Sequence, residues 1–254
     1  MFTEERYQYI LEQLSQHGKV LVKDLSQVLS LSESMIRKDL QTLEKKGLLQ
    51  RTYGGAIPIQ RGLSVTESFT KRNEKEHEQK ELMAQKAVQE IREDETIFLD
   101  ASTTSYSIAK LLISQNIRIT VITNMYAISS FIPEGCNVTF LFVGGEYNAI
   151  VGGCIGSFTN DQIKRYRCNR AFIGCVGVDL SDFTVNTALL DDATLKQTIL
   201  SVSNRCYLLV NNRKFNAQSS FVYANLSEFD CIITEETPSR EIVEQVNSAQ
   251  VSLL

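Results

Sequence analysis

Five groups of polar and glycine residues follow short apolar runs in the C-terminal three quarters of the chain. They cover residues 100–104, 123–124, 144–156, 174–196 and 211–215. Hydroxyl side chains and free backbone N–H groups at the start of a helix bind anions, and lysine adds charge for a phosphate. Asp100 can accept from sugar hydroxyls, and Lys196 and Lys214 can face a phosphate. The alternative for each group is structural, because such residues also cap helices and make turns.

A second group with chemical potential lies within residues 32–56. Met35, Ile36, Leu40 and Leu43 recur at helical spacing and predict one apolar face, with Ser32 capping the helix start and Gly47 ending it. The opposite face carries short polar groups and cations, as a helix in a DNA major groove requires: Ser34, Arg37, Lys38, Gln41 and Lys45. A solvated amphipathic helix is the alternative interpretation.

The elements around this helix predict a winged helix-turn-helix. A first helix begins after Thr3 and ends at His17 and Gly18, and a second short helix turns Val22, Leu25, Val28 and Leu29 inward. Residues 30–32 form the turn before the third helix. The run from Leu48 to Tyr53, closed by Gly54 and Gly55, suits a strand and tight turn, which is the wing.

The rest of the chain alternates apolar runs with helical patterns, which indicates a mostly parallel sheet covered on both faces. The strands are expected at 97–99, 119–122, 138–143, 171–178, 206–210 and 231–234, and the helices at 105–114, 125–131, 191–203 and 238–247. Ligands of such sheets bind beyond the carboxyl ends of the strands, where the polar groups fall. The expected organisation is a DNA-binding domain at 1–57, a linker and connecting helix at 58–80 with a charged, solvated outer face, and an α/β effector domain at 81–254.

Charge is divided unevenly along the 254 residues. The net charge is −4, but residues 1–61 hold nine Lys and Arg against seven Asp and Glu, whereas the remainder holds seventeen against twenty-three. A mildly basic module on an acidic one fits a DNA-binding region attached to a region that need not touch DNA. The small excess implies that two such modules act together, hence a homodimer or larger homo-oligomer.

Several other classes of protein are disfavoured. The six cysteines form no CxxC pair and there are two histidines, so neither disulfides nor a metal site is expected. No apolar run approaches the roughly 20 residues of a membrane span, and no secretory segment precedes the first helix, so the expected location is the cytoplasm. No catalytic residue and no cofactor are expected.

These residues resemble the DeoR-type (deoxyribose-operon repressor) family of bacterial regulators over nearly the whole chain. The N-terminal likeness runs from Ile36-Arg37-Lys38-Asp39-Leu40 through Leu43, Glu44, Gly47, Leu48 and Arg51 to Gly54-Gly55-Ala56. The C-terminal likeness rests on Asp100, Thr103, Thr104, Thr123, Asn124, Gly144, Gly145, Phe172–Gly174, Gly177–Asp179, Lys196, Lys214 and Phe215. The resemblance implies an effector domain similar in fold to ribose-5-phosphate isomerase and the CoA transferases. It also implies a repressor of a carbohydrate-catabolic operon, bound to double-stranded operator DNA and released by a phosphorylated sugar.

The chain departs from the family pattern at several positions. Met35 stands where Thr is usual, Tyr53 where His is usual, Ser102 where Gly is typical, Asp192 where Glu is common and Asn211 where Asp is usual. The run Ser181-Asp182-Phe183 lacks an expected glycine.

Two sets of site residues follow. The expected DNA-binding residues are Ser32, Ser34, Arg37, Lys38, Gln41, Lys45, Arg51 and Tyr53. The expected effector-binding residues are Asp100, Ser102, Thr103, Thr104, Thr123, Asn124, Gly144, Gly145, Asp179, Lys196 and Lys214. Two alternatives stay open: a constitutive DNA-binding protein with a degenerate sensor domain, and a sugar-phosphate isomerase using Asp100, Asp179 or Asp192 as base with Lys196 on the phosphate.

Overall fold

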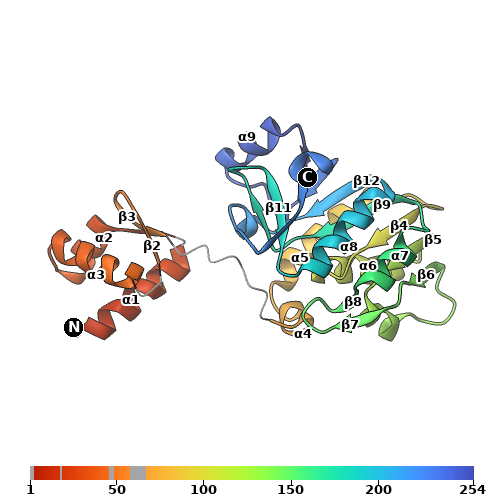
Figure 1. Cartoon of the computed structure of the whole chain (residues 1–254), viewed down its shortest axis with the longest axis horizontal. Helices are drawn as coiled ribbons and strands as arrows, with labels where there is room; N and C mark the ends of the chain where they lie inside the picture. Colours follow the sequence, from red (N-terminus) through yellow and green to blue (C-terminus); the bar gives the residue numbers. More distant parts are fainter. Residues whose placement is uncertain (1–2, 18, 46–48, 58–66) are drawn as a thin grey trace. The chain divides into compact units, whose positions relative to one another are not determined.

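The computed structural model describes residues 3–17, 19–45, 49–57 and 67–254, and the chain divides into residues 1–61, the head, and residues 62–254, the body. The head has the predicted helices and wing: α1 (Thr3–His17), β1 (Val20–Leu21), α2 (Val22–Leu29), α3 (Glu33–Lys45), β2 (Gln50–Thr52) and β3 (Gly55–Ile57) (Figure 1). Its strands pair antiparallel in the order β1-β3-β2. Gly55 is required because a Cβ there would lie 1.9 Å from the carbonyl oxygen of Val20. The predictions for Gly18, Gly47 and Leu48 fall outside the described residues.

Two predicted core residues of the head are exposed. Ile36, Leu40 and Leu43 are buried, but Met35 is 43% exposed and Val28 is 64% exposed. Each residue of an α-helix advances the side chain by about 100°, so Met35 points away from the stripe that Ile36 begins. Val28 similarly lies about a quarter turn from the inward side of α2. The inward prediction for both residues was wrong.

One buried ion pair ties the head helices together. Arg6 of α1 donates from Nε and Nη2 to the carboxylate of Asp39 on α3, at 2.6 and 2.9 Å. The hydrogen bond to Asp39, together with its charge, raises the pKa of Arg6 above the usual arginine range. The pair links α1 to α3, and sequence reasoning did not foresee it.

The body is built around a seven-stranded parallel sheet in the order β15-β14-β12-β9-β4-β5-β6, which confirms the predicted fold class. Its strands are β4 (Thr96–Leu99), β5 (Ile119–Thr123), β6 (Val138–Phe142), β9 (Cys168–Gly174), β12 (Ser203–Leu209), β14 (Cys231–Ile233) and β15 (Ser252–Leu253). The helices are α4 (Phe69–Asn73), α5 (His77–Gln89), α6 (Thr103–Gln115), α7 (Ser157–Ile163), α8 (Leu190–Ser201) and α9 (Arg240–Ser248) (Figure 1). Within the described part of the chain, no helix is long and apolar enough to cross a membrane.

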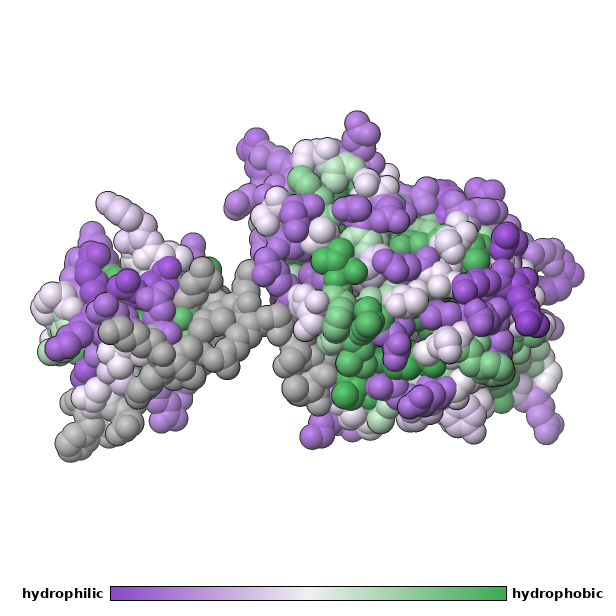
Figure 2. Space-filling view, in the orientation of Figure 1, coloured by the Kyte–Doolittle hydropathy of each residue, from purple (hydrophilic) through white to green (hydrophobic). Residues whose placement is uncertain are grey.

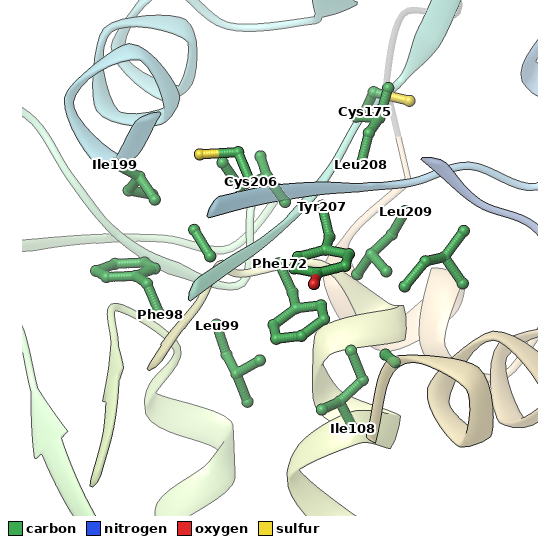
Figure 3. Packing of buried hydrophobic residues seen from close by; sticks show 14 of the residues in the cluster. Phe98, Leu99, Ile108, Phe172, Cys175, Ile199, Cys206, Tyr207, Leu208 and Leu209 are labelled. Atoms are coloured by element: carbon green, nitrogen blue, oxygen red, sulfur yellow. The ribbon is translucent and has the colours of Figure 1, made fainter. Parts of the chain in front are cut away.

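Alternating side chains of the sheet pack against helices on its two faces. Phe172 of β9 and Tyr207 of β12 are register partners, and their rings stack at 4.9 Å on the face that also carries Ile108 of α6 (Figure 3). Phe98 of β4 lies on the other face, which also carries Ile199 of α8 (Figure 3). These side chains have no exposed surface, as expected for a sheet covered on both sides.

Several local features of the body differ from the sequence predictions. The run 171–178 is two strands, because the chain leaves the large sheet after Gly174 and enters a small antiparallel sheet of β10 (Gly177–Asp179), β11 (Thr184–Thr187) and β13 (Phe221–Asn225). The segment predicted as a helix at 125–131 is a 3₁₀ helix, η1 (Tyr126–Phe131). A hairpin of β7 (Glu146–Asn148) and β8 (Gly153–Ile155), and the short 3₁₀ turns η2 (Asn212–Lys214) and η3 (Leu226–Glu228), were not predicted.

The run Ser181-Asp182-Phe183, which lacks the glycine of the family pattern, includes a residue in the left-handed region, because the φ of Phe183 is +57°. A bulky residue in the left-handed region is strained. The side chain is partly buried and packs against the body core, which offsets that strain.

Candidate functional site

The centre of the candidate site is Asp100, the first residue after β4. Its carboxylate is completely buried and accepts hydrogen bonds from Lys196 Nζ at 2.6 Å, the Gly174 amide at 2.8 Å, Ser105 Oγ at 2.8 Å and the Ser102 amide at 3.1 Å. Burial alone would raise the pKa of Asp100, but the charge and hydrogen bond of Lys196, with those of Ser102 and Ser105, hold it below its usual value. A carboxylate with four donors is a positioning group, and its low pKa makes it a poor base.

Asp100 thereby fixes the loop that opens α6. Ser102 caps α6 by accepting from the Ser105 amide at 3.1 Å. A Cβ on Gly174 would lie 2.6 Å from Ser102 Cβ, so only glycine lets β9 approach this loop. The first-turn amides of Thr103 and Thr104 have no intrahelical acceptor, because the first four N–H groups of a helix lack one. They are therefore available to an anion at the positive end of the helix.

Lys196 of α8 lies between two carboxylates. Its Nζ is 2.6 Å from Asp100 and 3.6 Å from Asp192, and the Asp192 carboxylate also accepts from Thr187 Oγ1 at 2.5 Å. Burial lowers the pKa of Lys196, but the two carboxylates outweigh it and the pKa is raised. Lys196 is thus already neutralised by carboxylates, which leaves less of its charge for a ligand.

Two adjoining cavities open beside the α6 amides. The smaller has a volume of about 60 Å³ and its lining includes Ser102, Asp192 and Lys196. The larger has a volume of about 470 Å³, and its lining comes mainly from residues 67–83, which include Arg72 of α4, and from the segment after β12. The two share part of their lining: Arg72, Thr103, Thr104, Cys175, Val176 and Lys214.

Three cations at these cavities form no ion pair with any described carboxylate. Lys214 Nζ donates to the carbonyl of Cys175 at 2.7 Å, Arg72 Nη2 donates to the carbonyls of Ile150 and Val151 at 2.7 and 3.1 Å, and Lys80 Nζ donates to carbonyls at the end of α4. Burial, with Lys214 and Arg72 adding repulsion, lowers the pKa of Lys80 to about 8 against the attraction of Glu76.

The pKa of Lys214 is lowered in the same way, by burial and then by the neighbouring arginines. Cations that repel one another in a partly dry cavity attract an anion.

The predicted effector residues fall into two groups. Ser102, Thr103, Thr104, Lys196 and Lys214 line the cavities, and Asp100 lies behind them as the group that orients Ser102 and Lys196. The second group lies outside the lining of both cavities: Thr123, Asn124, Gly144, Gly145 and Asp179.

The second group has structural partners. Thr123 Oγ1 accepts from the Met125 amide at 3.0 Å, and Asn124 donates to the Cys154 carbonyl at 2.9 Å, although its Oδ1 is buried without a partner. The Gly144 carbonyl accepts from α7, Gly145 lies close against that helix, and Asp179 accepts from Ser181. Their effector role stays a prediction.

Sequence reasoning missed Arg72 and Lys80, which both lie in the run interpreted as a solvated face. Lys80 is 6% exposed. A signal was present for Lys80: it precedes Met83, Ala84 and Ala87 by three, four and seven residues, which places it on the buried stripe of α5. No comparable periodicity marks Arg72.

The candidate DNA-binding surface lies on the head. Ser32, Ser34, Arg37, Lys38 and Gln41 are exposed along α3, and the visible surface over this helix is largely hydrophilic (Figure 2). Ser32 Oγ accepts from the Met35 amide at 3.3 Å, which confirms the predicted cap. Lys45 closes α3, but its side chain lies outside the described part.

The two arginines of this surface have acidic partners. Arg37 pairs with Glu33 at 3.0 Å while both side chains stay more than half exposed. Arg51 Nε pairs with Glu44 at 2.8 Å, and the Arg51 amide donates to the same carboxylate, which ties the wing to α3 and lowers the pKa of Glu44. Tyr53 stands fully exposed at the wing tip.

Two family models match the chain. Residues 6–61 match the DeoR-like helix-turn-helix domain, and residues 75–236 match the DeoR C terminal sensor domain. The chain is 33% identical over 233 residues to the L-fucose operon activator of Haemophilus influenzae, covering 91% of this chain and 92% of that protein. It is 28% identical to the HTH-type transcriptional repressor GlcR of Bacillus subtilis (100% and 96% covered) and 26% identical to the glycerol-3-phosphate regulon repressor of Escherichia coli K12 (98% and 97% covered).

Solved structures match part of the chain at low identity. A D-ribose-5-phosphate isomerase in complex with phospho-erythronic acid is 18% identical, with a TM-score of 0.39, over 54% of this chain and 52% of that one. The eIF2B delta subunit of Chaetomium thermophilum is 13% identical, with a TM-score of 0.45, over 65% and 58%.

Proposed function

The chain belongs to the DeoR family of DNA-binding transcriptional regulators, and from this premise we propose that it represses a carbohydrate-catabolic operon and leaves the operator when the body binds a phosphorylated sugar. In the head, Arg37, Lys38 and Gln41 read or flank base edges, because they follow one another along the exposed face of α3. Ser34 and Arg51 bind phosphates at either side of them. Ser32, Lys45 and Tyr53 complete the surface.

The observation that carries the effector proposal is the set of three cations without carboxylate partners, Arg72, Lys80 and Lys214, next to the free amides of α6. Cations with neutral partners gain more from a bound phosphate than cations already paired with carboxylates, because no opposite charge yet compensates their own. The phosphate therefore belongs near Thr103 and Thr104.

The lining around this point supports a hydroxylated remainder for the ligand. The smaller cavity presents the Ser102 hydroxyl and the Asp192 carboxylate, both of which can hydrogen-bond sugar hydroxyls. Its volume of about 60 Å³ leaves no room for a long lipid-like tail. A phosphorylated sugar is the ligand class that satisfies both parts of the lining.

An isomerase is disfavoured by the same geometry. Asp100 accepts four hydrogen bonds, and the pKa values of Asp100 and Asp179 lie below the usual range, so neither carboxylate is prepared to remove a proton near neutral pH. Asp192 accepts from Thr187 and lies 3.6 Å from Lys196. The relatives named above are transcriptional regulators.

The test is a thermal-shift panel on the full chain with pentose and hexose phosphates, each beside its unphosphorylated sugar. A true effector at 100 times its Kd stabilises the body by about 2.7 kcal/mol, and its unphosphorylated partner does not. Any hit is then added to a complex of the protein with DNA from upstream of its own gene, and it should release the DNA. DNA binding at low salt with no stabilising sugar phosphate would replace effector control by constitutive binding.

One relative is an activator, so the direction of control needs its own measurement. A reporter behind the bound DNA should rise in expression when the regulator's gene is deleted. A fall in expression would reverse the proposed sign while leaving DNA binding intact.

A further inference from the structure

Helix α4 is the first described helix of the body, and it is joined to the head through residues 58–66. Phe69 anchors it: the side chain is 6% exposed and its ring meets the ring of Tyr106 on α6 edge-on at 5.7 Å. The Phe69 amide donates to the Ala149 carbonyl at 3.1 Å, and a Cβ on Gly152 would lie 2.3 Å from the Phe69 ring. The start of α4 is therefore fixed independently of any ligand.

The remainder of α4 is fixed by polar contacts at the cavity wall. Arg72 donates from Nη2 to two carbonyls of the β7–β8 turn, but its Nε is buried and has no partner. Lys80 of α5 donates to two carbonyls. One belongs to Arg72 in α4, and the other belongs to Lys75, two residues after the helix ends. Both cations thus hold α4 through neutral acceptors, and each has more N–H donors than these carbonyls use, because arginine carries five and lysine three.

Acidic side chains of the same segment are already used. Glu67 pairs with Lys75 at 2.6 Å, and Glu76 pairs with Arg213 from the segment after β12. These pairs leave Arg72 and Lys80 without carboxylates, although both line a cavity of about 470 Å³. Arg72 of α4 and Lys80 of α5, whose charges no carboxylate neutralises, therefore line the same cavity as the first residues of α6.

We propose that Arg72 binds the anion of the ligand and that the bound anion clamps α4 to the start of α6. This inference rests on the proposed function. It adds Arg72 as the residue that couples ligand binding to α4, the helix that follows the connection with the head. A bound oxyanion accepts from Arg72 and from the Thr103 and Thr104 amides together, so it adds a polar link between α4 and α6 to the Phe69–Tyr106 ring contact that already joins them. Ligand binding therefore changes the stability of α4, the first described helix after the connection with the head.

The experiment is hydrogen exchange of the full chain, titrated with inorganic phosphate. The proposal predicts slower exchange at residues 70–76 of the α4 segment and at residues 103–106 of α6, with one common midpoint, and no change in α9. Protection at 103–106 without protection at 70–76 would overturn the clamp and leave the phosphate site standing. No protection at either place would overturn both the clamp and the proposed site.

Two substitutions separate binding from mere structure. Arg72→Gln should move the phosphate midpoint at residues 103–106 about tenfold higher, whereas Lys71→Gln, which removes the same charge from an exposed neighbour, should leave it in place. Arg72→Lys keeps the charge and should recover part of the affinity. If Arg72→Gln speeds exchange of α4 without phosphate but leaves the midpoint at 103–106 unchanged, Arg72 is a structural residue and the proposal is wrong.

Discussion

Replacing Asp100 by Asn is the most direct test of how the site is assembled. The substitution keeps the shape of the side chain and removes its charge. It leaves Lys196, which is 5% exposed, with Asp192 at 3.6 Å as its remaining carboxylate. It also turns one acceptor oxygen into an NH₂ group that faces a donor in either orientation: Lys196 Nζ and the Gly174 amide in place of Oδ2, or the Ser102 amide in place of Oδ1. The expected result is a large loss of stability of the body.

The size of the loss follows from the contacts. Breaking a buried ion pair by removing one partner costs about 3–5 kcal/mol, and the remaining Asp192 carboxylate places this case near the lower end, about 3 kcal/mol. Domains are stable by roughly 5–15 kcal/mol, so the variant still folds. With a urea dependence of about 2 kcal/mol/M, the unfolding midpoint of the body should fall by about 1.5 M.

The pH dependence gives a second readout with a definite sign. The pKa of Asp100 is lowered on folding, so its contribution is present above the unfolded value of about 3.9 and is lost as pH falls through the lower folded pKa. The pKa of Lys196 is raised, so its contribution is present below about 10.4 and is lost as pH rises through the higher folded pKa. The difference between wild type and Asp100→Asn should be constant from about pH 5 to 9 and shrink below about pH 3.9.

The assay is pulse hydrogen exchange across a urea series, measured on peptides of β4 and β9 so that the body is followed apart from the head. Asp161→Asn is the matched control, because Asp161 forms an exposed pair with Lys164 at 2.9 Å and such pairs contribute roughly 0–1 kcal/mol. If Asp100→Asn moved the midpoint no further than this control, the buried pair would not be what holds the α6 loop and α8 together.

Three further outcomes are expected. Arg37→Ala should weaken binding to a specific operator by about 1–3 kcal/mol if the side chain reads a guanine, while Arg240→Ala, which removes a similar exposed helical ion pair from the body, should leave titrations with operator DNA unchanged. Asp39→Ala leaves Arg6 buried without its partner and should destabilise the head by about 3–5 kcal/mol, seen as loss of exchange protection in α1 and α3 while the body stays protected. Sulfate binding, measured by calorimetry, should weaken as pH rises through about 8, where Lys80 loses its proton, and Lys80→Met should remove that step; an unchanged step would assign it to another group.

The sequence was sufficient for most of the fold because its strongest signals are local. The helix period gave α3 with its Ser32 cap, and the short apolar runs gave the parallel sheet in which Phe172 and Tyr207 are register partners. Errors arose where a short element leaves few residues to define a face, as at Val28 on an eight-residue helix. The small antiparallel sheet was missed because the chain changes sheets within an unbroken apolar run, and periodicity cannot mark that change.

The candidate site was predicted less completely because its charges are defined by their partners. Asp100, Lys196 and Lys214 were all expected to face a ligand, but the structure commits the first two largely to each other and leaves the third with a carbonyl. Whether a cation is paired with a carboxylate depends on contacts such as that between Lys196 and Asp100, which are 96 positions apart. Such contacts cannot be inferred from composition or local spacing.

Arg72 and Lys80 are the opposite case, because they line the cavity but were not predicted as site residues. Both lie in residues 70–81, where eight of the twelve residues are charged, and in such a run a solvated face is the usual outcome. Their neighbours Lys75 and Glu76 are indeed paired near the surface. Lys80 is distinguished by full burial and Arg72 by partial burial, because α4 is anchored by Phe69 and α5 turns its inward stripe toward the same cavity. A buried cation without a carboxylate is costly to the fold, so a site that holds several together is stable mainly when an anion joins them, and that requirement is the physical basis for expecting a phosphate.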